Sequence, residues 1–433
     1  VEWLGEIPEA WDTLRIGFFY SRVKETDRGD LPLLSVYREY GVIPKNSRDD
    51  NFNNASEDLS TYQVVQENDL VINKMKAWQG SLGISHYEGI VSPAYFVLRP
   101  RQECTYSFNK QFLHYLLRSQ IYFAEYEKRS KGIRINQWDL PYEEFKTIAV
   151  LLPPLLTQKA IAAFLDARTA RIDGLVRDYE ELVALLKEKR QALVSHAVTR
   201  GLSELVSPDD PEFGEWAQPV AFKDASVEWL REIPEGWELK KLSFLFKAKK
   251  GSNAAQLTKE YCASIEGEYP VYSGQTENDG IMASINMAEF DSGSDGYLFS
   301  TTVGAKAMSL MHIRGKFSLS QNCMVIIPIT NTTNVKFYFY HMQPLFSYER
   351  GLIPEYMQAS FRMEDLYKYR LALPSIPIQK AIAAFLDRET AKLGALIAES
   401  EGAIELLKER RSALITAAVT GKINVEERVG VQP

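Results

Sequence analysis

The chain has 433 residues, of which 45% are hydrophobic and 25% charged, a composition typical of a folded globular protein with two to four domains. No apolar run approaches the roughly 20 residues of a membrane helix, and the opening residues do not resemble a signal peptide, so we expect a cytoplasmic protein. Cys104, Cys262 and Cys323 lack any C-x-x-C spacing, which argues against a disulfide framework and a zinc site.

The net charge of −7 is concentrated in one stretch. Residues 201–238 contain ten acidic and two basic side chains, so the other 395 residues sum to +1. Basic surfaces outside this stretch are therefore compatible with nucleic-acid binding, although the whole chain is acidic.

The chain contains one large internal repeat. The first eleven residues, VEWLGEIPEAW, recur at 227–237 as VEWLREIPEGW, with nine identities. The block QKAIAAFLD at 158–166 recurs unchanged at 379–387. Two copies of about 200 residues each predict an internal pseudo-twofold arrangement.

Two dissimilar segments, 12–150 and 238–372, separate the matching blocks. Both alternate short runs rich in Val, Ile, Tyr and Phe with Gly, Asn and Ser, which predicts two mixed α/β domains. We expect strands at 69–72, 95–98, 296–299 and 324–327, and helices around 112–117 and 337–342. A constant scaffold with two different inserts is typical of a protein that recognises two different targets.

Each repeat ends in a long helical pattern. Apolar spacings of 3, 4, 3, 4 and 7 residues predict two long antiparallel coiled-coil helices, 167–199 and 388–420, with Asp166 and Asp387 as their caps after a short break. The alternative is that each helix docks only on its own domain. The buried line of the coiled coil, the seam, is predicted to contain Ile172, Leu175, Tyr179, Leu182, Leu186 and Leu193 in the first copy and Leu393, Leu396, Ser400, Ala403, Leu407 and Leu414 in the second.

Basic, amide and aromatic side chains cluster in both variable segments. Lys and Arg neutralise phosphates, while Arg, Asn and Gln form hydrogen bonds to base edges, so these clusters predict DNA contacts. The candidates are Lys74, Lys76, Trp78, Gln79, Arg129, Lys131, Arg134, Asn136 and Gln137 in the first segment, and Gln275, Thr276, Lys306, Lys316, Arg350, Tyr356, Gln358 and Arg362 in the second. We find no phosphate loop, cofactor-binding turn or metal-ligand spacing, so no catalytic residue, metal or cofactor is expected.

The duplicated motifs resemble the specificity subunit of type I restriction-modification systems. They are the VEWLGEIPEAW box, the Pro-Pro-Leu-x-x-Gln-x-x-Ile-x-x-Phe-Leu-Asp run at 153–166, and the Ala-Val-Thr-Gly-Lys end at 418–422. The resemblance covers essentially the whole chain. It implies an α+β protein with a first target-recognition domain at 1–150, a first conserved helical region at 151–200, an acidic linker and second repeat start at 201–237, a second target-recognition domain at 238–372, a second helical region at 373–422 and a tail at 423–433.

The resemblance also implies a function. A subunit of this family is non-catalytic, binds double-stranded DNA with an asymmetric two-part target, and recognises one half-site with each domain. Its helices set the gap, the number of base pairs between the two half-sites. They also bind two methyltransferase subunits and, through these, the restriction and translocase subunits. Two alternatives remain: a coiled-coil adaptor that binds two protein partners, and a self-contained DNA methyltransferase or restriction enzyme.

Overall fold

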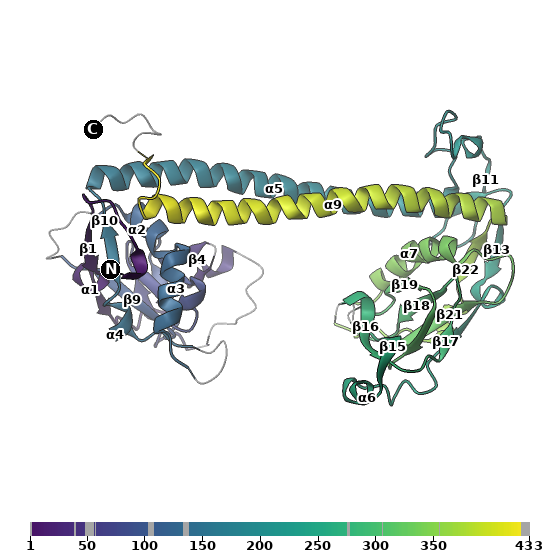
Figure 1. The fold of residues 1–433 in the computed structure, drawn as a ribbon, viewed down its shortest axis with the longest axis horizontal. Coiled ribbons are helices and arrows are strands. Elements are labelled where there is room, and N and C mark those ends of the chain that lie inside the picture. Colours follow the sequence, from purple (N-terminus) through teal and green to yellow (C-terminus); the bar gives the residue numbers. More distant parts are fainter. Residues whose placement is uncertain are drawn as a thin grey trace. The chain divides into compact units, whose positions relative to one another are not determined.

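The computed structural model describes residues 2–38, 40–47, 56, 58–102, 108–132, 138–274, 278–304, 306–354 and 356–425. The chain divides into two compact units. Unit 1 contains Val1–Glu180 and Glu401–Pro433, and unit 2 contains Glu181–Ser400. Each unit therefore combines one variable segment with part of each of two long helices (Figure 1).

Unit 1 is built on an antiparallel sheet in the order β2-β9-β6-β7. Both faces of its inner strand β6 are covered: Leu70 and Ile72 belong to one apolar cluster, and Val71 belongs to another. The strands are β1 (Asp12–Arg15), β2 (Tyr20–Val23), β3 (Leu34–Tyr37), β4 (Gly41–Pro44), β5 (Gln63–Val65), β6 (Leu70–Asn73), β7 (Leu82–Ile84), β8 (Gly89–Val91), β9 (Tyr95–Pro100) and β10 (Ala149–Leu152). The helices of this segment are α1 (Ile16–Phe19), α2 (Lys110–Leu117), α3 (Gln120–Arg129) and α4 (Tyr142–Phe145).

Unit 2 repeats this plan with the sheet β14-β21-β18-β19 and adds a second sheet, β16-β15-β20-β17. The strands are β11 (Phe222–Asp224), β12 (Glu232–Pro234), β13 (Glu238–Lys241), β14 (Phe246–Lys249), β15 (Glu266–Tyr272), β16 (Ile281–Ile285), β17 (Phe290–Asp291), β18 (Tyr297–Thr301), β19 (Leu310–Ile313), β20 (Lys316–Leu319), β21 (Cys323–Pro328) and β22 (Arg370–Leu373). The helices are α6 (Lys259–Ser264), α7 (Val335–Gly351) and α8 (Met363–Leu366). The predicted mixed domains, four strands and two helices are confirmed.

The two long helices are α5 (Leu155–Arg200) and α9 (Ile376–Val419), and both are unbroken. The predicted breaks, with Asp166 and Asp387 as caps, are therefore wrong. The identical QKAIAAFLD blocks contain good helix formers and neither Pro nor Gly, so the backbone hydrogen bonds continue through them. The two carboxylates instead accept hydrogen bonds from Tyr115 and Tyr340.

Within each unit α5 and α9 pack against each other in antiparallel directions (Figure 1). In unit 1, Leu165 of α5 shares a cluster with Ala418 of α9, and further along Arg411 Nε donates to Asp173 at 2.8 Å. In unit 2, Ala197 and Leu386 share the other cluster. The first residues of both helices are also part of the domain cores. Each long helix therefore packs both against the other long helix and against a recognition domain.

The seam differs from the prediction at three positions. Leu175, Leu182 and Leu396 are 41%, 41% and 48% exposed, whereas Val183 and Ile404 are buried. Along the seam the buried apolar residues are Ile172, Val183 and Val194 in α5 and Leu393, Ile404 and Ile415 in α9. They recur every 11 residues, so the buried line follows about 3.67 residues per turn instead of the 3.5 of the predicted seven-residue repeat. Among the other predicted positions, Ile172, Leu393 and Ser400 are buried, and Tyr179, Leu186, Leu193, Ala403, Leu407 and Leu414 are half-buried.

Each copy of the eleven-residue box caps the end of a long helix. Gly201 and Gly421 end α5 and α9 with φ of +86° and +73°, the left-handed conformation that glycine adopts without strain. In unit 1 a Cβ on Gly421 would lie 2.5 Å from Pro8, so the box packs directly on this turn. Short 3-10 helices lie at η1 (Glu2–Leu4), η2 (Lys45–Ser47), η3 (Ala77–Gln79), η4 (Gly214–Trp216), η5 (Leu242–Phe244) and η6 (Asn278–Gly280).

The acidic linker of unit 2 is fastened to α9. Arg388 contacts Asp210 at 3.1 Å and Glu212 at 3.2 Å, and Phe213 packs edge-on against Phe385. The hydrogen bond from Arg388, followed by backbone amides, lowers the pKa of Asp210 to about 2.

We expect the linker to loosen in acid. A carboxyl whose folded pKa is below its unfolded value of 3.8 stabilises the fold above that value, and the stabilisation is lost as the pH falls through about 2. Proteolysis within residues 201–216 should therefore accelerate between pH 4 and pH 2, and Asp210→Asn should show fast cleavage already at pH 4. Equal cleavage of both proteins at pH 4 would contradict this.

Candidate nucleic-acid interface

The first cluster of predicted contacts lies where β6 ends. The turn after β6 leads into η3, and the carbonyl of Lys74 accepts a hydrogen bond from the amide of Leu140 at 3.0 Å. That bond joins the turn to the segment before α4. Across it the rings of Trp78 and Trp138 lie 5.1 Å apart. The structure thus joins residues far apart in the sequence on one surface of unit 1.

Four cations border this surface and differ in availability. Lys76 is exposed, and Lys131 is 72% exposed while pairing with Glu144 at 3.0 Å. Arg129 is held inside the domain, because its guanidinium contacts Glu125 at 2.6 Å and donates to Thr147 at 2.8 Å. Arg129 therefore acts on the shape of this surface and is left out of the proposed contacts. Gln79 and Lys74 are half-buried.

The second cluster lies at the same place in unit 2, where β18 ends. The carbonyl of Thr302 accepts a hydrogen bond from the amide of Phe361 at 2.7 Å, and the amide of Gly304 donates to Ala359 at 3.1 Å. Arg350 at the end of α7 donates to the carbonyl of Ala307 at 2.7 Å and so holds the turn. The exposed side chains gathered here are Lys306, Arg350, Tyr356, Gln358 and Arg362.

The two clusters share their backbone and differ in their side chains. The β6 turn and the β18 turn occupy equivalent positions in sheets of the same strand order, and each is fastened to the segment before a short helix. Gly80 and Met308 both have positive φ, +86° and +64°, at the same step of the turn. Trp78 at one turn corresponds to Lys306 at the other, so the two surfaces present different chemistry.

Not every predicted contact residue joins these clusters. Lys316 belongs to β20 of the second sheet, where its Nζ lies 5.8 Å from the ring of Tyr269. Arg134, Asn136, Gln137, Gln275 and Thr276 lie outside the described residues. Trp138 was not among the predicted contacts, although it directly follows the predicted Gln137 in the sequence.

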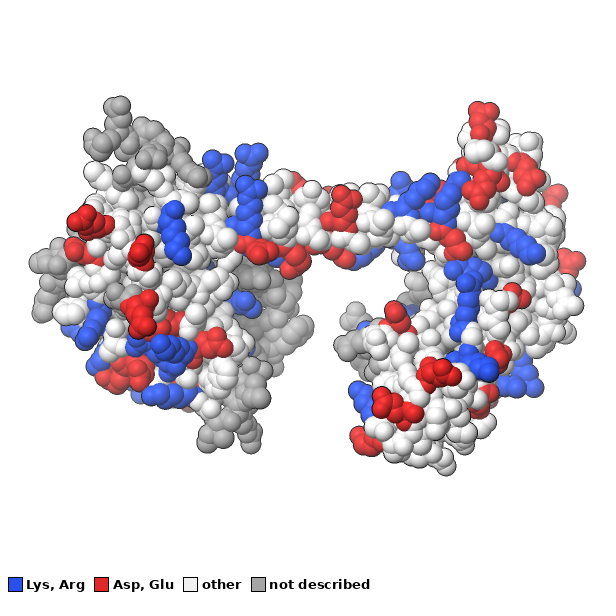
Figure 2. All heavy atoms as spheres, in the orientation of Figure 1, with Lys and Arg blue, Asp and Glu red and all other residues white. Residues whose placement is uncertain are grey.

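The side chains of both surfaces have the chemistry that suits nucleic-acid binding. Figure 2 shows Lys and Arg interspersed with Asp and Glu on the visible face of each unit. Among the described residues no group of His, Cys, Asp and Glu could hold a metal ion, and no helix there is long and apolar enough to cross a membrane. Exposed cations suit phosphates, and exposed Gln and Arg suit base edges.

The cations predict a salt-dependent effect. Lys76→Ala is expected to weaken binding of all duplex sequences alike, and to reduce the slope of log affinity against log salt by about 0.9, because one phosphate contact is lost. Binding titrations at several salt concentrations measure this slope. Lys259→Ala on α6 is the control. An effect confined to one DNA sequence would instead show that Lys76 contacts a base.

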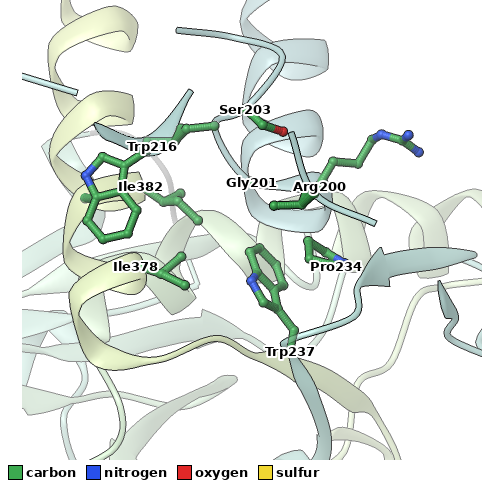
Figure 3. A pocket seen from close by; sticks show the side chains of 11 residues that line it. Arg200, Gly201, Ser203, Trp216, Pro234, Trp237, Ile378 and Ile382 are labelled. Carbon is green, nitrogen blue, oxygen red and sulfur yellow. The ribbon is translucent and has the colours of Figure 1, made fainter. Parts of the chain in front are cut away.

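Unit 2 also contains a small apolar pocket of about 70 Å³ (Figure 3). It lies between the end of α5, the start of α9 and the second box, and Trp216, Trp237 and Ile382 line it. Arg200 at its edge stacks on Phe222, 4.2 Å from the ring centroid. The pocket is a packing gap at a junction of elements, and its size and lining give no reason to assign a catalytic role.

Comparison with known proteins identifies relatives of both repeats. The family model described as "type I restriction modification DNA specificity domain" matches residues 8–181 and 234–406, more than half of the chain. The EcoKI specificity subunit of Escherichia coli K12 is 29% identical over 33% of this chain and 30% of its own length. The MpnII specificity subunit of Mycoplasma pneumoniae is 28% identical over 36% of this chain and 45% of its own.

These matches are partial, since each covers less than half of the curated relative's length. One solved structure covers more. It belongs to work on complex assembly and conformational transition of the type I R-M system, and it matches 96% of this chain and 100% of its own with a TM-score of 0.67 at 16% identity. The likeness shows that the folds agree.

Proposed function

The chain belongs to the family of type I restriction-modification DNA specificity domains, and on that premise we propose that it recognises an asymmetric two-part DNA target. Each recognition domain contacts one half-site, the first within residues 1–150 and the second within 238–372. The two conserved helical regions, 151–200 and 373–422, set the gap between the half-sites.

One observation carries this proposal. The turns after β6 and β18 have the same backbone anchor, from Leu140 to Lys74 and from Phe361 to Thr302, but carry different side chains. Recognition of two different half-sites requires this combination. The backbone hydrogen bond holds each turn in the same position, while the side chains on the two turns differ. Indirect readout of DNA shape adds to these contacts.

The internal repeat also supports a partner protein of which two copies bind, one to each unit. Phe18 and Phe244 occupy equivalent positions just before β2 and β14 and are 61% and 65% exposed. Leu175 and Leu406 are exposed in unit 1, and their repeat equivalents Leu396 and Leu185 are exposed in unit 2. Large apolar side chains exposed at matching positions fit two copies of one protein. We assign these copies to type I methyltransferase subunits, through which restriction and translocase subunits join.

The chain itself is non-catalytic in this proposal. The described residues of both clusters are mainly cations, amides and aromatic rings, and none of them forms an activated nucleophile or an acid-base pair. The reaction then belongs to the methyltransferase subunits, and a cytoplasmic location follows from the need to reach DNA.

The test is duplex selection from a random-sequence pool by this chain with and without its methyltransferase subunit. Recovery of two dissimilar short motifs at a fixed gap is expected from the complex. Salt-sensitive but sequence-blind retention would contradict sequence recognition. If the complex retains no DNA, the chain is a protein adaptor, and if the chain alone binds and turns over a methyl donor, the non-catalytic assignment is wrong.

A further inference from the structure

A pair of polar contacts joins each recognition domain to its own long helix, and it is the same pair in both units. On the domain side the contacts come from an Asn-x-x-Phe-x-x-Tyr sequence, Asn109 to Tyr115 at the start of α2 and Asn334 to Tyr340 at the start of α7. On the long-helix side they come from the first and last residues of the identical QKAIAAFLD blocks. The sequences of the two domains are otherwise dissimilar, so this repetition is informative.

The first contact is a buried glutamine at the start of the long helix. In unit 1 Gln158 Oε1 accepts from the amide of Asn109 at 2.7 Å, and its Nε2 donates to the carbonyl of Pro153 at 2.7 Å. In unit 2 Gln379 Oε1 accepts from the amide of Asn334 at 2.7 Å, and its Nε2 donates to Pro374 at 2.8 Å. The glutamines are 2% and 0% exposed, so neither bond is replaced easily by water.

The second contact lies two turns further along. In unit 1 the hydroxyl of Tyr115 donates to Asp166 at 2.7 Å and lies 3.2 Å from Thr169 Oγ1. In unit 2 the hydroxyl of Tyr340 donates to Asp387 at 2.6 Å and lies 3.2 Å from Thr390 Oγ1. Each aspartate has one more partner on the same domain helix: Gln111 Nε2 donates to Asp166 at 2.9 Å, and Lys336 Nζ pairs with Asp387 at 3.1 Å. Burial, and then the hydrogen bond to Asp387, raises the pKa of Tyr340 to about 12, so this hydroxyl keeps its proton and remains a donor at physiological pH.

The glutamine and aspartate contacts together fix the orientation of the domain helix on the long helix, which one contact alone does not. Eight residues separate the glutamine from the aspartate, about 12 Å along the long helix, while six residues separate the asparagine from the tyrosine. A single hydrogen bond lets the domain helix pivot on the long helix, whereas a second one at this distance opposes that rotation. Apolar packing alone is non-directional and resists it less.

We propose that these two points form a clamp that sets the angle of each recognition domain on its long helix, and through that angle the number of base pairs that the target must have between its half-sites. The second part rests on the proposed function. Tyr115 and Tyr340 are positioning residues in this scheme, because they act on the spacing of the contacts and touch no DNA themselves.

The chain offers a matched pair of substitutions on one helix. Both are made in a Lys336→Met background, because Lys336 Nζ of α7 also pairs with Asp387 at 3.1 Å. In that background Tyr340→Phe removes the remaining hydroxyl of the clamp. Tyr338→Phe removes another buried hydroxyl of α7, one that donates to the carbonyl of Ala372 inside the domain at 3.1 Å. Both delete one buried hydrogen bond and are expected to lower thermal stability, so stability alone does not distinguish a clamp from ordinary packing.

The distinguishing measurement is the preference for gap length. The complex with the methyltransferase subunit is titrated with the selected duplex and with duplexes one base pair longer and shorter. We expect Tyr340→Phe to reduce the discrimination between correct and altered gaps about tenfold, the effect of one charge-assisted hydrogen bond, without changing the selected half-site sequences. Tyr338→Phe should retain the discrimination of the Lys336→Met background. Equal discrimination by both variants would overturn the proposal.

A second measurement needs no DNA. Spin labels on Ser294→Cys and Ala391→Cys report the distance between the recognition domain and α9 within unit 2, in a Cys104→Ser background where Cys262 and Cys323 are buried. Tyr340→Phe is expected to broaden the distance distribution, and Tyr338→Phe to leave it narrow. If the unaltered complex selects no two-part target, both the proposed function and the role of the clamp in setting the gap are wrong. The distances between the spin labels still test whether the clamp fixes the angle of the domain on its helix.

Discussion

Replacing Gln358 and Arg362 by alanine is expected to abolish recognition of one half-site and to leave the other intact. Both side chains are exposed beside the β18 turn, where the bond from Phe361 to Thr302 holds the backbone in place. A good bidentate contact to a base contributes about 1–3 kcal/mol of discrimination, so the loss of two should reduce the preference for that half-site about 100-fold or more.

Repeating the random-sequence selection with the variant complex measures this. One motif should become degenerate while the second motif and the gap persist. The reciprocal variant, with Trp78 and Lys131 replaced in unit 1, should affect the other motif instead. Lys259→Ala on α6 controls for a general loss of charge. Equal degradation of both motifs by either variant would show that the two surfaces do not act on separate half-sites.

Acidification from pH 7 to pH 4 is expected to lower the free energy of unfolding by about 3 kcal/mol through His341 alone. This side chain is fully buried in α7 and connects three elements of unit 2. Its Nε2 accepts from the amide of Ala372 at 3.1 Å, which leaves the proton on Nδ1, where it donates to the carbonyl of Val198 at 3.1 Å. A second proton on Nε2 would face an N–H group and break this arrangement.

The sign of the effect follows from the pKa. Burial lowers the pKa of His341 from 6.5 to about 4, so between these values the unfolded chain binds more protons than the folded one. The stabilisation is therefore complete above about pH 6.5 and is lost as the pH falls toward 4.

His341→Gln tests this cause directly, because an amide donates and accepts but does not titrate. The variant should be less stable at pH 7 and should lose less stability between pH 6.5 and pH 4 than the unaltered chain. Urea unfolding at several pH values measures the difference, and hydrogen exchange at the Ala372 amide locates it in unit 2. His86→Gln, at an exposed position, is the control. Parallel pH profiles for the unaltered chain and His341→Gln would contradict the assignment.

The sequence by itself determined the internal repeat, the family, and the presence of long helices and short strands. These features depend on local pattern: identical blocks such as QKAIAAFLD, the 3-4 apolar spacing of the long helices, and short runs of β-branched and aromatic residues between turns. Strands such as β6 and β21 were placed within a residue for the same reason. The Asn-x-x-Phe-x-x-Tyr sequence shared by Asn109–Tyr115 and Asn334–Tyr340 was also present, but its meaning depends on a partner about 50 residues away.

Only the tertiary structure decided which residues meet. The predicted seam follows a seven-residue repeat, whereas the buried seam positions of α5 and α9 recur every 11 residues, which buries Val183 and Ile404 and leaves Leu175, Leu182 and Leu396 exposed. The expected caps became acceptors for tyrosines, because a continuous helix has no free amides at Asp166 or Asp387. Arg129 looked like a DNA contact in the sequence, yet Glu125 and Thr147 hold it inside the domain. Pairing between residues distant in sequence is set by the shape of the packed chain, which spacing along the chain does not encode.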